Sequence, residues 1–198
     1  KSQFDTFYHE HPRTYSAKSF EYIANKFDKE LLHIEFPKRY GGNIRAYIGN
    51  RKYHKLVPTL TKVNETNFYK EFIAMEALID KWKKNCKEMI SKMIRENNNK
   101  PIPAKAFPGR AAILIKLLSL DKDCISAVYE IKGSIKTGNY LPGTRIPILP
   151  EKDLYDSKYN GPILNLAWHL PNEVRSNLLS NGFKGTVYDV LDYDLLSN

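Results

Sequence analysis

The spacing of apolar residues near the start of the chain predicts one helix followed by two strands. Residues 16–27 place apolar side chains at helical intervals, and Ser16 precedes them as a favourable N-cap. The apolar runs at 31–36 and 43–49 look like strands, with a glycine pair between them that suits a turn. So small a set cannot fold alone, so we expect this segment to be the tail of a larger domain. The apolar helix positions are Phe20, Ile23 and Phe27.

A single long helix is predicted for residues 65–95. Its apolar positions alternate at spacings of four and three, which is the heptad pattern of a narrow packing seam. Two interpretations fit: the helix lies on the C-terminal domain as a connector, or it pairs with a second copy in a homodimer. The seam residues are Phe68, Phe72, Met75, Ile79, Trp82, Cys86, Met89 and Met93.

Strand and helix patterns alternate through the last hundred residues. Continuously apolar strands between helices are typical of a mostly parallel sheet covered on both faces. The fold class is therefore α/β, with a Rossmann-like C-terminal domain. Strands are predicted at 124–131, 161–168 and 186–191, segment 101–107 leads into a helix at 108–120, the apolar segment 146–150 follows a loop, and a helix spans 171–182 between Pro171 and Gly182.

These patterns divide the chain into three parts. We expect residues 1–52 to be the C-terminal tail of a catalytic domain, 53–99 to be a connector built on the long helix, and 100–198 to be the Rossmann-like domain. The two cysteines, Cys86 and Cys124, form no disulfide framework, which favours a reducing, cytoplasmic setting.

The composition is that of a soluble protein, with 42% hydrophobic and 27% charged residues. No apolar run approaches the roughly 20 residues that cross a bilayer, so we expect no membrane partner. The net charge of +9 raises the question of nucleic acid, but the lysines are scattered and no recognition motif accompanies them. A small anionic ligand, such as a nucleotide diphosphate, fits this charge better.

The stretch "AKAFPGRAAIL" (104–114) is a candidate anion site. It stands where a strand of an open α/β sheet leads into a helix, the usual place for ligands in such folds. Lys105 and Arg110 flank a Pro108–Gly109 turn, which would let backbone amides approach an anion. The alternative is two exposed cations at an ordinary helix start.

Two further segments carry candidate binding residues. Asn165, Trp168 and His169 follow a buried strand and would face the same rim as Lys105. Trp168 could stack on a base or sugar, or could close the core. The long loop 137–147 carries Tyr140 and Arg145, and loops of this length in a compact domain are often functional.

The run Tyr8, His9, Glu10, His11 concentrates proton-transferring side chains. In an extended segment Tyr8 and Glu10 would face one side and the two histidines the other. The spacing is wrong for a zinc helix, although two histidines one residue apart can ligate a metal from a strand. Histidine titrates near neutral pH beside a carboxylate or phenol that tunes it, which suits general-base chemistry. A solvent-exposed loop without chemistry remains the third interpretation.

Several segments resemble a known family. "QFDTFYHEHPRTYSAKSFEYIANKF" and "FPKRYGGNIRAYIGN" resemble the last part of the methyltransferase domain in S-adenosylmethionine-dependent sugar methyltransferases. "IPAKAFPGRAAILIKLL", "YLPGTRIPIL" and "ILNLAWHL" resemble the Rossmann-like C-terminal domain of the same enzymes. Together the similarity covers nearly the whole chain, with the long helix as connector.

The resemblance implies roles for individual residues. His11 corresponds to the general base of the family, with Tyr8 and Glu10 positioning it or the substrate. His9 is an extra histidine near the substrate, and Arg13 follows it. The C-terminal domain of the family helps to hold a nucleotide-linked sugar, which implies that role for Lys105, Arg110, Tyr140, Arg145, Asn165, Trp168 and His169.

The sequence also departs from the family. "KPIP" (100–103) replaces the usual glycine-containing turn, and the cysteine-rich zinc region of some relatives is missing, so we expect no metal. The glycine-rich loop and acidic residue for S-adenosylmethionine do not occur and would lie upstream of Lys1. We therefore expect this chain to be inactive alone and part of a methyltransferase acting on a nucleotide-activated sugar, with oxygen slightly favoured over carbon as acceptor. The alternative is a non-catalytic module that binds sugar nucleotides or nucleic acid.

Overall fold

The computed structural model describes residues 3–8, 10–37, 43–52 and 65–192. They form two compact units. The larger unit combines Gln3–Glu10 with Glu76–Asn198, and the smaller unit is the intervening segment His11–Met75. The short N-terminal segment therefore belongs with the C-terminal part of the chain rather than with the residues that directly follow it. The boundaries expected near residues 52 and 99 stay predictions.

The smaller unit contains the predicted helix and two strands. They are α1 (Ala17–Lys26), β1 (Glu30–Glu35) and β2 (Arg45–Gly49), with β1 and β2 antiparallel. Ser16 caps α1 as expected, because its hydroxyl accepts the Ser19 N–H at 3.2 Å in a capping box. Phe27 is 72% exposed because α1 ends at Lys26 and the chain then leaves the helical path.

The predicted long helix is α2 (Phe68–Glu96). From Glu76 onward it packs into the larger unit, where the Trp82 indole N–H donates to the Val190 carbonyl at 2.9 Å. This half of the helix lies on the C-terminal domain, and the homodimer stays a prediction. The residues that α2 buries are Trp82, Cys86, Ile90 and Met93, whereas Phe68 and Phe72 of the seam are exposed.

A five-stranded parallel sheet forms the centre of the larger unit, in the order β5-β4-β3-β6-β7. This confirms the α/β, Rossmann-like fold. Its strands are β3 (Ile102–Lys105), β4 (Ile125–Glu130), β5 (Ile148–Pro150), β6 (Ile163–Asn165) and β7 (Val187–Asp189), and its helices besides α2 are α3 (Ala111–Leu118), α4 (Glu151–Asp156) and α5 (Pro171–Ser180).

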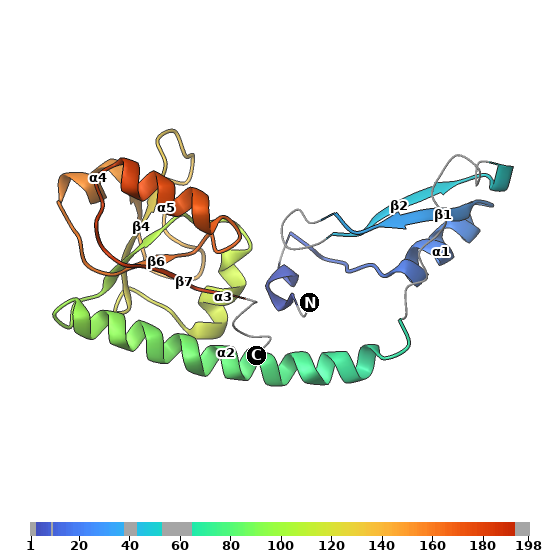
Figure 1. The fold of residues 1–198 in the computed structure, drawn as a ribbon, viewed down its shortest axis with the longest axis horizontal. Helices are drawn as coiled ribbons and strands as arrows, with labels where there is room; N and C mark the ends of the chain where they lie inside the picture. Colours follow the sequence, from blue (N-terminus) through green and yellow to red (C-terminus); the bar gives the residue numbers. More distant parts are fainter. Residues whose placement is uncertain (1–2, 9, 38–42, 53–64, 193–198) are drawn as a thin grey trace. The chain divides into compact units, whose positions relative to one another are not determined.

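Helices cover both faces of this sheet. Figure 1 shows α4 and α5 on one side of the strands and α2 and α3 on the other. Parallel crossovers are right-handed, so connections that run in opposite directions across a sheet place their helices on opposite faces. Beneath α4 and α5 lies a core cluster of Leu154, Ile163, Ala167, Val174, Leu178 and Phe183. Among the described residues, no helix has both the length and the apolar character needed to span a membrane.

Candidate functional site

The path of the chain across the sheet reverses its direction between the two central strands, β3 and β6. The chain leaves β3 toward β4 and leaves β6 toward β7, although β3 and β6 are paired side by side. Open α/β sheets bind ligands beyond the carboxyl ends of the strands at such a switch point. The loops that follow the two strands are 106–110 and 166–170. They carry three of the residues that the sequence nominated, Arg110, Trp168 and His169, while Lys105 and Asn165 end the strands themselves.

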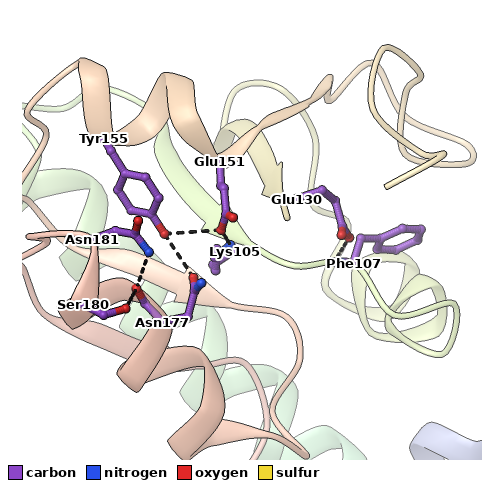
Figure 2. Close-up of polar contacts among 8 residues, drawn as sticks. All are labelled: Lys105, Phe107, Glu130, Glu151, Tyr155, Asn177, Ser180 and Asn181. Carbon is purple, nitrogen blue, oxygen red and sulfur yellow. Dashed lines mark hydrogen bonds and ion pairs between the residues drawn. The ribbon is translucent and has the colours of Figure 1, made fainter. Parts of the chain in front are cut away.

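The loop after β3 is held in one conformation from two sides. Ala106 has a left-handed backbone, with φ of 60°, which an alanine adopts only at a cost in free energy. The Phe107 N–H donates to the buried Glu130 carboxylate at 2.6 Å, and the Lys136 ammonium donates to the Phe107 carbonyl. Figure 2 shows Glu130 reaching this loop from the end of β4.

Lys105 ends β3 in a buried ion pair. Its ammonium lies 2.5 Å from the Glu151 carboxylate, and the two side chains are 2% and 17% exposed. The Tyr155 hydroxyl lies 3.4 Å from Glu151 and 3.0 Å from the Asn177 amide oxygen (Figure 2). Burial raises the pKa of Tyr155 to about 12, with the Glu151 charge adding to the effect, so this phenol stays protonated at neutral pH.

Asn165, at the end of β6, is fully buried and engaged inside the fold. Its amide oxygen accepts the Ala167 N–H at 2.9 Å, and its amide nitrogen donates to Asp189 at 2.7 Å. Arg175 donates to both Asp189 oxygens, at 2.6 and 3.3 Å. In this structure Asn165 ties the ends of β6 and β7 together, and its predicted role in substrate binding stays a prediction.

Arg110 joins the two switch-point loops. Its guanidinium lies over the Trp168 ring, 5.1 Å from the centroid, and forms an ion pair with Asp5. The Arg110 and Asp5 side chains are 12% and 0% exposed. The alternative of two exposed cations at an ordinary helix start is therefore wrong. Lys105 is buried and Arg110 is mostly buried, and each has a protein carboxylate as its partner.

His169 and Trp168 follow β6 in direct contact. The two rings are 5.4 Å apart in an edge-on arrangement, and Trp168 is only 7% exposed. Burial lowers the pKa of His169, and the positive charge of Arg110 lowers it further against a smaller opposing effect of Glu173. The imidazole therefore favours its neutral form, while Trp168 closes the core and also supports Arg110.

The segment Phe4–Glu10 reaches the same loop. A Cβ atom added to Gly109 would lie 2.9 Å from the carboxylate of the exposed Glu10, so this side chain approaches the turn more closely than an alanine there would allow without a shift. Burial raises the pKa of the Tyr8 phenol, and the charge of Glu10 and a hydrogen bond to it raise that pKa further. The sequence predicted that backbone amides of the Pro108–Gly109 turn approach a ligand anion, and this stays a prediction; in the structure the Glu10 carboxylate lies beside the turn.

A family model, the C-methyltransferase C-terminal domain, matches residues 38–186. The chain belongs to this family. No curated protein matched the chain in a comparison of sequences. The family match includes Lys105, Arg110 and Trp168, and it begins after the segment that carries Tyr8 and Glu10. The resemblance stated from the sequence is confirmed for the C-methyltransferase C-terminal domain.

S-adenosylmethionine is the usual methyl donor of such enzymes, and the expectation that this chain does not bind it stays a prediction. In dinucleotide-binding folds, glycines in the turn after the first strand let the backbone approach the pyrophosphate closely. Here the carboxylate of the exposed Glu10 lies beside Gly109 in that turn. The described residues also bring together no group of three His, Cys, Asp or Glu side chains that could hold a metal ion.

His11 and Arg13 belong to the smaller unit, whereas Tyr8 and Glu10 belong to the larger unit. His11 is exposed, as a base that must reach a substrate requires, and its role stays a prediction. Arg13 lines an open cavity of about 590 Å³ together with Thr14, Tyr15, Lys18, Ser19, Tyr22 and Ile23. His9 lies outside the described residues.

Tyr140 and Arg145 lie away from the switch point of the C-methyltransferase C-terminal domain. Tyr140 is 58% exposed and pairs with Pro147, directly before β5. Arg145 lines a cavity of about 400 Å³ with Asp121 and Lys122, which precede β4. In a parallel sheet, residues before the strands lie at the edge opposite the carboxyl ends. Tyr140 and Arg145 therefore lie in the same domain as Lys105 but at the opposite edge of the sheet, and their predicted role in substrate binding stays a prediction.

The residues that the sequence analysis missed are carboxylates. Glu130, Glu151 and Asp5 fix the loop and neutralise its two cations. Asp5 stands in the same stretch as Tyr8 and Glu10, so its position next to the histidine-rich run was a usable signal. Nothing local marks Glu130 or Glu151, because their partners are distant in the sequence and become neighbours only through the order of the strands.

Proposed function

We propose that this chain is the C-terminal part of a methyltransferase that transfers a methyl group from S-adenosylmethionine to a nucleotide-activated sugar. Membership in the C-methyltransferase C-terminal domain family supports the methyltransferase part. The "HEHPRTYS" segment resembles O-methylating relatives more closely, so we propose a sugar hydroxyl as the acceptor, with carbon as the alternative.

One observation carries this proposal. The Tyr8–Glu10 pair, which the resemblance assigns to the active site, lies against Gly109 at the switch point of the family domain. This is the edge of an α/β sheet where ligands bind. A catalytic assignment from the N-terminal segment and a ligand-binding edge from the C-terminal domain thus fall on the same loop.

The proposed chemistry divides between proton removal and orientation. His11 removes the proton of the sugar group that is methylated, as a general base. Tyr8, whose pKa is raised, stays protonated and can donate a hydrogen bond to the sugar. Glu10 accepts hydrogen bonds from sugar hydroxyls. Methyl transfer is an in-line displacement, so much of the rate enhancement comes from alignment of the two substrates.

We propose that the phosphates of the nucleotide bind in the smaller unit. Lys105 and Arg110 are neutralised by Glu151 and Asp5, so they add little net attraction for a diphosphate. Arg13 and Lys18 instead line an open cavity that also includes Tyr15 and Tyr22, and its described lining residues include no carboxylate. An acidic side chain that takes part in the hydrogen bonds of this segment is Glu65, which accepts the Ala17 and Lys18 N–H groups at the start of α1. Cationic side chains form charge-assisted hydrogen bonds with phosphates, and tyrosine rings stack on the face of a base or sugar.

The test is calorimetric titration of the chain with GDP- and TDP-sugars. We expect the Arg13→Gln and Lys18→Gln variants each to weaken binding about tenfold, as loss of one charge-assisted contact would. The control is Lys152→Gln, at an exposed lysine of α4 in the larger unit. In the complete methyltransferase, His11→Ala should lower kcat far more than affinity for the sugar nucleotide.

Other outcomes would contradict the proposal. Equal affinity of the Arg13→Gln variant and the parent chain would remove the smaller unit as the phosphate site. Unchanged turnover of His11→Ala would remove the base. If a random oligonucleotide binds with a steep salt dependence while the sugar nucleotides do not bind, the chain is a nucleic-acid module instead.

A further inference from the structure

The segment Phe4–Glu10 is fixed to the C-terminal domain at its beginning. Phe4 is 2% exposed, and its ring lies 5.0 Å from the Trp82 ring of α2. Trp82 is itself tied to the Val190 carbonyl near β7 by a hydrogen bond of 2.9 Å. A buried phenylalanine of this kind contributes about 2 kcal/mol through its lost contact with water. The first residue of the segment is therefore an apolar anchor.

Asp5, the next residue, adds a charged anchor. Its carboxylate has no exposed surface and pairs with Arg110, whose guanidinium rests on Trp168. Removing one member of a buried ion pair leaves the other charged in a medium that solvates it poorly, so both members hold each other in place. Both anchors belong to the short helix Phe4–Thr6, after which the chain continues to Tyr8.

The far end of the segment lies beside Gly109. A Cβ added to Gly109 would lie 2.9 Å from the carboxylate of the exposed Glu10, close enough that this flexible side chain would have to shift, and Tyr8 forms a hydrogen bond with that carboxylate. Gly109 does not have a left-handed backbone, so an alanine would be accepted by the main chain there. Its one close contact of under 3 Å would be with Glu10.

We propose that Gly109 and Arg110 are positioning residues for the Tyr8–Glu10 pair. Arg110 acts through Asp5, and Gly109 acts by leaving room for the Glu10 carboxylate. The inference rests on the proposed function only in assigning Tyr8 and Glu10 to the active site. It gives the C-terminal domain of this chain a further task, which is to hold two residues of the proposed proton-transfer run that precede the family domain in the sequence.

The Gly109→Ala variant is the sharpest test, because the fold should tolerate it. We expect the displaced Glu10 carboxylate to release Tyr8, so that the pKa of Tyr8 falls toward its ordinary value. Carbon NMR of chain labelled at the tyrosine Cζ measures this pKa, with Tyr8→Phe assigning the signal. In a Glu10→Gln background, Gly109→Ala should cause no further fall. A Tyr8 pKa that is unchanged in a folded Gly109→Ala chain would overturn the role of Gly109.

Asp5→Asn and Arg110→Gln test the other anchor. We expect the Thr6, Phe7 and Tyr8 amides, which donate within the segment, to exchange hydrogen about tenfold faster or more in each variant. The double variant should be no faster than Arg110→Gln alone, because the two residues act through one another. Arg145→Gln, an exposed arginine of the same domain, is the matched control. Undiminished protection in Arg110→Gln would overturn its positioning role.

Activity provides a separate readout. In the complete methyltransferase, Gly109→Ala should lower kcat and leave the KM for the sugar nucleotide nearly unchanged. The NMR and exchange measurements need neither methyl donor nor sugar, so they hold even if sugar nucleotides fail to bind. Conversely, the complete enzyme could transfer methyl groups while the Tyr8 pKa and the exchange of the segment stay unchanged in these variants. That result would remove the positioning role and leave the proposed function intact.

Discussion

The Lys105 ammonium and the Glu151 carboxylate form an ion pair of 2.5 Å at the carboxyl end of the central strand β3. The lysine is 2% exposed, so it cannot return to water when its partner is lost. The pair joins β3 to the first turn of α4, and Tyr155 and Asn177 extend it toward α5. It is therefore a structural connection across the sheet, at an edge where a ligand-binding lysine was expected.

Glu151→Gln should destabilise the protein by about 3 kcal/mol, because it leaves the Lys105 ammonium buried without a counter-charge. Urea unfolding followed by circular dichroism measures the change. Asp156→Asn is the control, since its pair with Lys152 is 3.9 Å long and exposed, and it should change stability by less than about 0.5 kcal/mol. Similar effects of the two substitutions would show that Lys105 is solvated.

Ala106→Gly should stabilise the protein by about 0.5–1 kcal/mol. Ala106 has φ of 60°, a left-handed conformation that glycine adopts without the steric cost of a Cβ. Part of this gain is lost because glycine makes the unfolded chain more flexible. Ala112→Gly, inside α3, should instead destabilise by about 1 kcal/mol. Thermal unfolding of both variants separates the two effects, and a loss of stability in Ala106→Gly would refute the strain.

The stability of the protein should fall as pH rises from 10 to 12. Tyr155 has an ordinary pKa of 10.0 when unfolded and a pKa of about 12 in the fold. The unfolded chain therefore loses this proton first, so the stabilising contribution is complete below pH 10 and disappears as pH approaches 12. Urea unfolding at pH 9, 10 and 11 should show a weaker decline for Tyr155→Phe. Tyr22→Phe, at a tyrosine that is 63% exposed, should decline like the parent.

Arg110→Gln should raise the pKa of His169. Burial and the Arg110 charge both lower this pKa below 6.5, and the substitution removes the second cause only. A lowered pKa in the fold means that the neutral imidazole stabilises the protein above pH 6.5, and that this contribution is lost as pH falls below it. Histidine NMR titration should show a partial return toward 6.5, and Arg145→Gln should show none.

Most of the fold could be predicted from the sequence. The strands of the parallel sheet are continuous apolar runs, and Pro171 and Gly182 mark the ends of one helix by their backbone preferences. The helix α4 was missed, because six residues make too few turns to show a helical period. In α2 the heptad pattern favoured Met89, whereas Ile90 is buried, since a helix packed on a sheet uses a broader face than a coiled coil.

The candidate site could be predicted only in part. The turn at Gly109 was predicted to be a place for a ligand anion, because glycine before a helix permits close approach, and that role stays a prediction. The Glu10 carboxylate beside the turn comes from the N-terminal segment, and no local pattern encodes the folding of this segment onto the C-terminal domain. Arg145 was grouped with Arg110 by residue type, and strand direction instead places it beside Asp121 at the opposite edge.

The larger unit starts with Gln3–Glu10, is interrupted for the whole of His11–Met75, and resumes at Glu76. A shortened protein that began at Lys100 would keep every strand of the parallel sheet and still lack part of its own interior. Arg110 would lose the carboxylate that balances it, and both Phe4 and the aromatic ring of Trp82 beside it would be missing. Dissection of this protein into working pieces therefore has to retain both ends of the polypeptide together.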